Sequence, residues 1–198
     1  MSDLKDMFVN PRLRVGGYFE LAIQVSESVD NEVVRKYKKH LWDLLYIDGP
    51  YDREMSPKDV EPDGYCEEGI VHLYGRSIPF ITYYIKEESP VESGYNWFDV
   101  SFFTEAIDFV FGATNSDWPS RPSPPEEIRV FFKELMEAFY SIHPFRLAFC
   151  DFEISGQYYL HDLKAPNLQN WTNTHFYVPA SESKDILPQY HGMVTFIE

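Results

Sequence analysis

The chain has 198 residues, a formal net charge of −15, 17% aromatic residues and two cysteines. Its aromatic content excludes global disorder, and so few cysteines exclude a disulfide scaffold. The negative charge disfavours binding to nucleic acid or to anionic membranes, because both carry phosphate groups. The N-terminal segment lacks the apolar core of a signal peptide, and no stretch reaches the ~18 apolar residues of a membrane span. We therefore expect a cytoplasmic protein.

The first two predicted elements are a strand and a helix. Residues 18–25 alternate between two sets of side chains with the period of a half-buried strand. Residues 31–46 place apolar side chains at helical spacing, and Asp30 is a suitable N-cap. The basic residues of this helix fall mostly on the opposite face, and Gly49-Pro50 is expected to stop it.

Residues 48–69 predict an irregular loop, because acidic residues, proline and glycine dominate the segment. Residues 70–74 and 80–86 are rich in β-branched and aromatic side chains and predict a hairpin. Residues 97–103 alternate again and predict a further strand, which is followed by a short helix over 104–111.

The second half of the chain contains the strongest helix pattern. Residues 124–142 repeat apolar side chains at steps of three and four, and Ser123 with Glu126 has the spacing of a capping box. Residues 145–155 predict a strand, and the turn at Gly156 predicts that 157–163 returns as its hairpin partner. Two closing edge strands are expected, over residues 175–178 and 193–197.

These elements predict one α+β domain over residues 1–198. We expect a single layer of mostly antiparallel sheet, with two long helices and one short helix packed on it. The order lacks the regular βαβ alternation and the glycine-rich turn of a dinucleotide-binding fold.

The carboxylates after the second-half strand are candidate catalytic residues. Asp151 and Glu153 are two positions apart, so a strand would project both from one face. His161, on the predicted return strand, and Asp99 could complete a site for a metal-assisted hydrolase. The alternative interpretation is that these charges mark the place where the strand leaves the core.

The acidic loop carries a second candidate site. Asp59, Glu61 and Asp63, followed by Gly64, echo the opening of a calcium-binding loop. The twelfth position would be Ile70, where such loops need a bidentate glutamate, so we expect a solvated acidic loop instead. The six histidines and two cysteines show no zinc-binding spacing, and no cofactor is predicted.

Aromatic side chains are the third notable feature. Most are expected to fill the core, but Trp118 and Trp171 fall in predicted loops. Exposed tryptophan rings anchor protein interfaces and stack on flat ligands, so these two residues are candidate binding residues.

Three functions remain open. The absence of catalytic motifs and the acidic charge favour a non-catalytic protein-binding module, of the immunity or antitoxin-like kind that masks a basic partner, with the acidic loop as the binding face. No motif identifies such a family. The alternatives are a metal-assisted hydrolase that uses Asp151, Glu153 and His161, and an aromatic-lined small-ligand binder.

Overall fold

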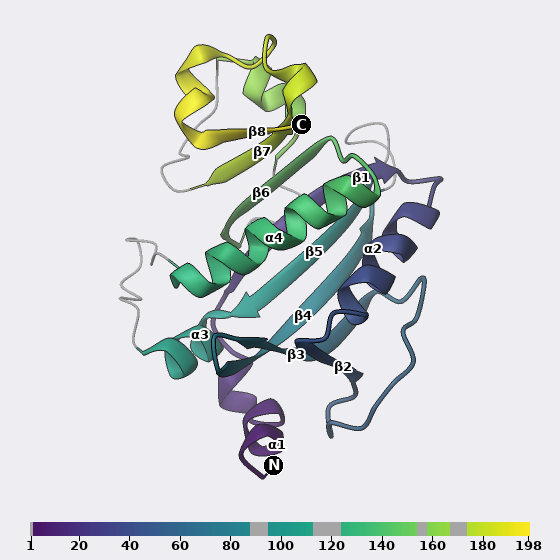
Figure 1. Cartoon of the computed structure of the whole chain (residues 1–198), viewed down its shortest axis with the longest axis vertical. Helices are drawn as coiled ribbons and strands as arrows, with labels where there is room; N and C mark the ends of the chain where they lie inside the picture. Colours follow the sequence, from purple (N-terminus) through teal and green to yellow (C-terminus); the bar gives the residue numbers. More distant parts are fainter. Residues whose placement is uncertain (1, 88–94, 113–123, 154–157, 167–173) are drawn as a thin grey trace.

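The computed structural model describes the chain except for residues 1, 88–94, 113–123, 154–157 and 167–173 (Figure 1). The fold is mixed α+β and is built on one eight-stranded sheet with the order β2-β3-β4-β5-β1-β6-β7-β8. All neighbouring strands are antiparallel except β7 and β8, which are parallel. The strands are β1 (Tyr18–Glu27), β2 (Ile47–Tyr51), β3 (Cys66–Leu73), β4 (Arg76–Lys86), β5 (Tyr95–Phe103), β6 (Leu147–Phe152), β7 (His175–Pro179) and β8 (Val194–Ile197).

Helices α2 and α4 lie across the same face of the sheet (Figure 1). The α-helices are α1 (Ser2–Phe8), α2 (Glu32–Trp42), α3 (Thr104–Phe111) and α4 (Glu126–Ile142). Four short 3-10 helices complete the described elements: η1 (Pro11–Leu13), η2 (Leu160–Lys164), η3 (Ala180–Glu182) and η4 (Pro188–Met193). No helix in the part of the chain that the structure describes is long and apolar enough to cross a membrane.

Strand β1 is central, and both of its faces are buried. Its odd-numbered side chains, such as Leu21 and Ile23, belong to the large core beneath the helices. Ala22 belongs to a second core on the opposite face, together with Phe149 of β6. The 3-10 helices η2 and η4 close this second core with Leu160, Leu163 and Tyr190. The sheet is therefore covered on both faces at this end, which the prediction of helices on a single layer did not include.

Helix α4 forms because its apolar side chains recur at helical spacing and meet the aromatic face of the sheet. Phe139 is fully buried, stacks on Tyr37 of α2 at 4.5 Å between ring centroids, and meets Phe98 of β5 edge-on at 5.7 Å. The helix begins at Glu126 after Pro125 at the N-cap position. Ser123, the predicted capping residue, lies outside the described residues.

Two predicted boundaries in the first half need correction. The helix expected over 31–46 ends at Trp42, and Asn31 occupies its N-cap position while the Asp30 carboxylate accepts the Glu32 N–H at 3.1 Å. The irregular segment expected over 48–69 is shorter, because β2 occupies its beginning and β3 starts at Cys66. Strand β2 carries Gly49-Pro50, a pair that favours turns in sequence analysis; here it lies on the edge of the sheet, where proline is tolerated.

The predicted hairpin in the second half is also wrong. Strand β6 ends at Phe152, and the described part of 157–163 contains the start of η2 rather than a strand. The antiparallel partner of β6 on that side is β7. Tyr158 and Leu160 resemble strand residues in sequence, but they pack against the sheet from the face opposite the helices. Helix α1 had no counterpart in the predictions.

We expect Phe139→Ala to lower the free energy of unfolding by about 3–5 kcal/mol, because it removes a fully buried ring between two helices and the sheet. Urea unfolding followed by fluorescence would measure the change. The exposed Phe109 of α3 is the matched control, and Phe109→Ala should cost less than about 1 kcal/mol. Equal losses in the two variants would contradict the placement of α4.

Candidate functional site

The acidic loop, residues 52–65 between β2 and β3, is the candidate site with the best defined supports. The side chains of Asp59, Glu61 and Asp63 are all exposed, as sequence analysis expected of a solvated loop. Tyr65 at the end of the loop is 63% exposed, and its ring lies 5.6 Å from that of Tyr83 on β4. The loop has no helix or strand of its own. Local hydrogen bonds shape its first turn, where the Asp52 carboxylate accepts the N–H groups of Glu54 and Ser56, and contacts with neighbouring elements hold the rest.

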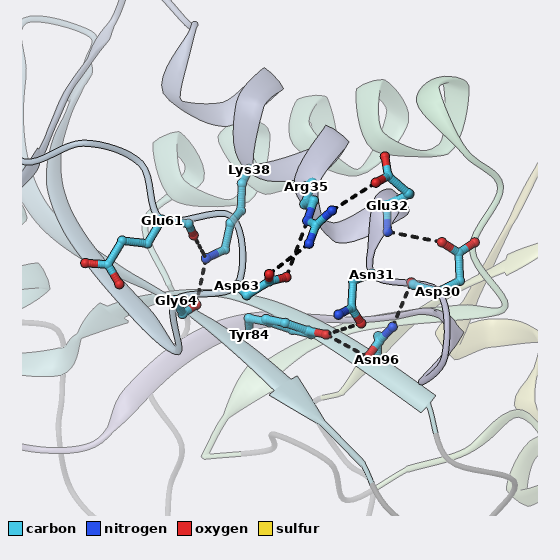
Figure 2. Close-up of polar contacts among 10 residues, drawn as sticks. All are labelled: Asp30, Asn31, Glu32, Arg35, Lys38, Glu61, Asp63, Gly64, Tyr84 and Asn96. Atoms are coloured by element: carbon cyan, nitrogen blue, oxygen red, sulfur yellow. Dashed lines mark hydrogen bonds and ion pairs between the residues drawn. The ribbon is translucent and has the colours of Figure 1, made fainter.

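Lys38 of α2 is the main anchor of the acidic loop (Figure 2). Its side chain is only 1% exposed, and its ammonium group donates to the carbonyl oxygens of Glu61 at 2.9 Å and Gly64 at 2.7 Å. Sequence analysis placed this lysine among the solvent-facing charges of the helix. Burial lowers the pKa of the Lys38 ammonium, and the neighbouring carboxylate of Glu67 opposes that shift. A lysine can be buried in this way because its N–H donors form hydrogen bonds that compensate for the loss of water.

Glu67 of β3 supplies the opposite charge. One of its carboxylate oxygens lies 3.5 Å from the Lys38 ammonium and accepts the indole N–H of Trp42 at 2.9 Å. The other oxygen accepts the backbone N–H of Glu61 at 2.8 Å. A single buried carboxylate thus joins α2, the acidic loop and the start of β3. The loop backbone is thus held through both kinds of polar group: Lys38 donates to its carbonyl oxygens, and Glu67 accepts one of its N–H groups.

A second, exposed anchor lies beside the first. The Arg35 guanidinium is 2.8 Å from the Asp63 carboxylate and 2.9 Å from Glu32 (Figure 2). The hydrogen bond to Asp63 raises the pKa of Arg35, and the same bond lowers the pKa of Asp63. Because the pair faces solvent, its contribution is small and falls with salt concentration. It orients the Asp63 side chain rather than stabilising the fold.

The beginning of α2 is fixed to the sheet by a polar chain. The Tyr84 hydroxyl of β4 lies 2.7 Å from Asn31 Oδ1 and 3.1 Å from Asn96 Oδ1 of β5 (Figure 2). The Asn96 amide donates to the Asp30 carbonyl at 2.8 Å. These bonds hold the turn before α2, so Arg35 and Lys38 project from a fixed helix. The acidic loop is consequently preorganised by the sheet through α2.

The three predicted catalytic residues occupy different settings. Asp151 on β6 is 2% exposed, and its carboxylate accepts the Thr174 hydroxyl at 2.5 Å. Glu153 follows the strand with a φ of 53°, is exposed, and accepts the backbone N–H of Tyr18 at 2.6 Å. His161 lies on η2, exposed, with its ring parallel to that of Tyr159 at 5.8 Å. Among the described residues, no group of three or more His, Cys, Asp or Glu side chains could hold a metal ion.

Sequence analysis missed a second acidic residue beside Asp151. Glu20 lies directly opposite Asp151 in the pairing of β1 and β6, and it is 3% exposed. Asp99 of β5, which was considered as a possible member of this group, is fully buried and opposite Ala22 of β1. The alternation along β1 assigned Glu20 to a solvent-facing position. That face of the sheet is covered, which the pattern of one strand does not reveal.

A groove of about 490 Å³ lies between α4 and the strands β7 and β8. Its lining combines apolar and aromatic side chains with charged ones: Met136, Tyr140, Tyr177, Phe196 and Ile197, with Lys133, Glu137, His175 and Glu198. His175 Nε2 lies 2.8 Å from the Thr195 hydroxyl, and burial, with a smaller effect from Arg129, lowers the pKa of the His175 ring. This groove is the feature closest to the aromatic-lined ligand site considered from sequence. Trp118 and Trp171 lie outside the described residues.

No family model, curated protein or solved structure matches the chain.

Removal of the buried anchor should loosen the acidic loop. We expect Lys38→Met to cost about 3–5 kcal/mol of unfolding free energy, because the buried Glu67 side chain would lose its cationic partner. Amide hydrogen exchange should also accelerate over residues 59–65. Lys39→Met, at a neighbouring exposed lysine, should change stability by less than about 0.5 kcal/mol. Identical exchange rates in the two variants would show that the loop is held by other contacts.

The half-buried imidazole of the groove predicts a pH dependence. Because the folded-state pKa of His175 is lowered, the unfolded chain binds a proton more readily than the folded chain. The contribution of His175 to the free energy of unfolding is present above the unfolded-state pKa of about 6.5 and is lost as the pH falls below that value. Thermal unfolding between about pH 7.5 and about pH 5.5 should therefore show a smaller loss of stability for His175→Gln than for the unmodified chain. Parallel pH profiles would contradict this account.

Proposed function

We propose that the chain is a protein-binding module that uses the acidic loop to dock a basic protein. The observation that carries this proposal is the buried Lys38–Glu67 pair, which fixes the backbone of a loop whose own carboxylates point into solvent. A preorganised loop loses little conformational entropy when it binds, so more of its contact energy appears as affinity. Binding residues are found disproportionately on loops that a rigid scaffold positions.

The chemistry of the loop surface favours a cationic partner. Asp59, Glu61 and Asp63 are exposed, and the chain as a whole carries a net charge of −15. Such a surface accelerates encounter with a basic protein and repels acidic ones. Tyr65 ends the same loop with a large, exposed amphipathic ring, the kind of side chain that contributes most to interface affinity. Small immunity or antitoxin-like proteins that mask basic toxins act by this kind of occlusion, and we place the chain in that functional class as a proposal.

The groove between α4 and β7–β8 supports a second candidate function, the binding of a small aromatic-compatible ligand. Tyr140 and Tyr177 provide flat apolar surface, and Lys133 and Glu137 provide polar groups in the lining. The groove is separate from the acidic loop, so ligand binding there and protein docking are distinguishable by mutation. A metal-assisted hydrolase has less support, because the described candidate carboxylates and His161 occupy different environments.

The docking proposal is tested by neutralising the loop while the buried Lys38–Glu67 anchor is kept. The variant Asp59→Asn, Glu61→Gln, Asp63→Asn removes three charges at exposed positions. Tagged protein would be incubated with extract of its native cells at low and at high salt, and retained basic proteins would be quantified by mass spectrometry. We expect the unmodified chain to retain a basic partner at low salt, and the variant to lose about tenfold in retention.

A charge-matched control separates local docking from the overall field. The variant Glu105→Gln, Glu134→Gln, Asp185→Asn makes the same change of net charge at exposed positions on α3, α4 and the C-terminal segment. If retention of the basic protein falls equally in both variants, the interaction is nonspecific charge attraction and the docking proposal is wrong. Retention that is unaffected in the loop variant would exclude the acidic loop as the docking surface.

A further inference from the structure

Three polar side chains on neighbouring strands form a hydrogen-bonded chain that the docking proposal does not use. His72 of β3 lies at its centre, with Nδ1 2.8 Å from the hydroxyl oxygen of Ser77 on β4. Its other ring nitrogen, Nε2, lies 2.8 Å from the carboxylate of Asp48 on β2. A hydroxyl, an imidazole and a carboxylate in this order are the components of a nucleophile, a base and a group that orients the base.

The geometry of the sheet fixes these three residues. His72 and Ser77 are directly opposite each other in the hairpin of β3 and β4. The hairpin closes with Tyr74 and Gly75, both at positive φ, which matches the tight turn that keeps such a register. Val71 and Leu73 point into the core beneath the helices, so His72 projects from the opposite face. The side chains are partly open to solvent, with exposed fractions of 35% for His72 and 46% for Asp48.

The carboxylate determines which ring nitrogen is basic. In the tautomer with the ring proton on Nε2, this nitrogen donates to the Asp48 carboxylate, and Nδ1 presents its lone pair to the Ser77 hydroxyl. Ser77 can then lose its proton to Nδ1 while it attacks. The two ring nitrogens have exchanged the roles that they have in the common serine protease arrangement, but the order of the three functions is the same.

A backbone donor is available next to the hydroxyl. The N–H of His72 donates to the Tyr46 carbonyl of the chain before β2, and therefore points away from β4. This makes His72 and Ser77 a non-hydrogen-bonded pair, so the Ser77 N–H also points away from β3. In the described sheet, the pairing of β4 with β5 begins at Ile81 and Ser101 and does not reach Ser77. The Ser77 N–H can stabilise an oxyanion that forms on a carbonyl attacked by its own hydroxyl.

We propose that Ser77, His72 and Asp48 form a nucleophilic site that accepts an acyl group from small, apolar carboxylic esters. The Ser77 oxygen forms a bond to the ester carbonyl carbon, and its proton moves to His72 Nδ1. The ester C–O bond then breaks, and the proton passes to the departing alkoxide to give an alcohol. Water attacks the acyl-serine by the same route and releases the carboxylic acid, so that no oxidant, metal or further co-reactant is needed.

The surroundings favour an apolar acyl group. Tyr74, in the turn of the same hairpin two positions after His72, is 72% exposed and supplies an apolar ring at that end of the hairpin. The site is open rather than enclosed, which favours small activated esters. It shares no residue with the acidic loop as the structure defines it, residues 52–65, and the two proposals can fail independently.

Covalent labelling tests the site directly. The full chain would be incubated with a fluorophosphonate probe, and the modified residue would be identified by peptide mass spectrometry, with hydrolysis of p-nitrophenyl butyrate as a second readout. We expect one equivalent of label on Ser77, and labelling at least about a hundredfold slower in His72→Gln and about tenfold or more slower in Asp48→Asn. Ser77→Ala should remove both the label and the esterase activity.

Ser141 is the internal control, because it is exposed and its hydroxyl donates to the Glu137 carbonyl of its own helix rather than to a base. Circular dichroism and thermal melting would verify that each variant is folded, and Asp48→Asn keeps the test valid if His72→Gln is unstable. Absence of label on Ser77, label at similar rates on Ser77 and Ser141, or a rate that Asp48→Asn leaves unchanged would each overturn the proposal.

Discussion

Strand β1 is the element on which the arrangement of the sheet depends, because it pairs with β5 on one side and with β6 on the other. These pairings join the two halves of the chain, and both faces of the strand are buried, so it contributes to two cores at once. Helices α2 and α4 on one face of the sheet, and η2 and η4 on the other, are therefore positioned relative to one strand. The hydrogen bonds from Tyr84 and Asn96 to the turn before α2 extend this order to the acidic loop.

The surface that faces a partner is less negative than the net charge of −15 implies. Glu20, Glu67, Asp99 and Asp151 are buried, and Arg35 and Lys58 lie within ion-pair distance of two of the loop carboxylates. Attraction of a basic protein consequently depends on where the remaining carboxylates are exposed rather than on their total number. A loop held in one conformation presents its carboxylates at fixed positions. The same charges on a mobile segment would be spread over many positions.

The sequence predicted the elements whose pattern of apolar and polar side chains can be recognised within a single segment, namely β1, the hairpin of β3 and β4, and α4. It misassigned elements that depend on distant partners. β2 contains Gly49-Pro50 and becomes a strand only through its pairing with β3, and η2 was mistaken for a strand because its aromatic neighbours pack on a covered sheet face. The exposure of Asp59, Glu61 and Asp63 was predictable from composition, but Lys38 and Glu67 were not, because burial of a charged residue is decided by the elements that surround it. Asp48, His72 and Ser77 are likewise brought together only by the register of three strands.

The position of β1 has a consequence for the way the protein is made. Tyr18, at the start of this strand, forms a hydrogen bond with Glu153, 135 residues further along the chain. At a synthesis rate of about 5–20 residues per second, roughly 7–30 seconds pass between the appearance of the two residues on the ribosome. During that interval one hydrogen-bonding edge and one apolar face of β1 lack their native partners, a state that invites pairing with other chains. The folding chain is thus expected to need protection during translation, or rapid capture of β1 by the hairpin and β5, which are complete well before β6.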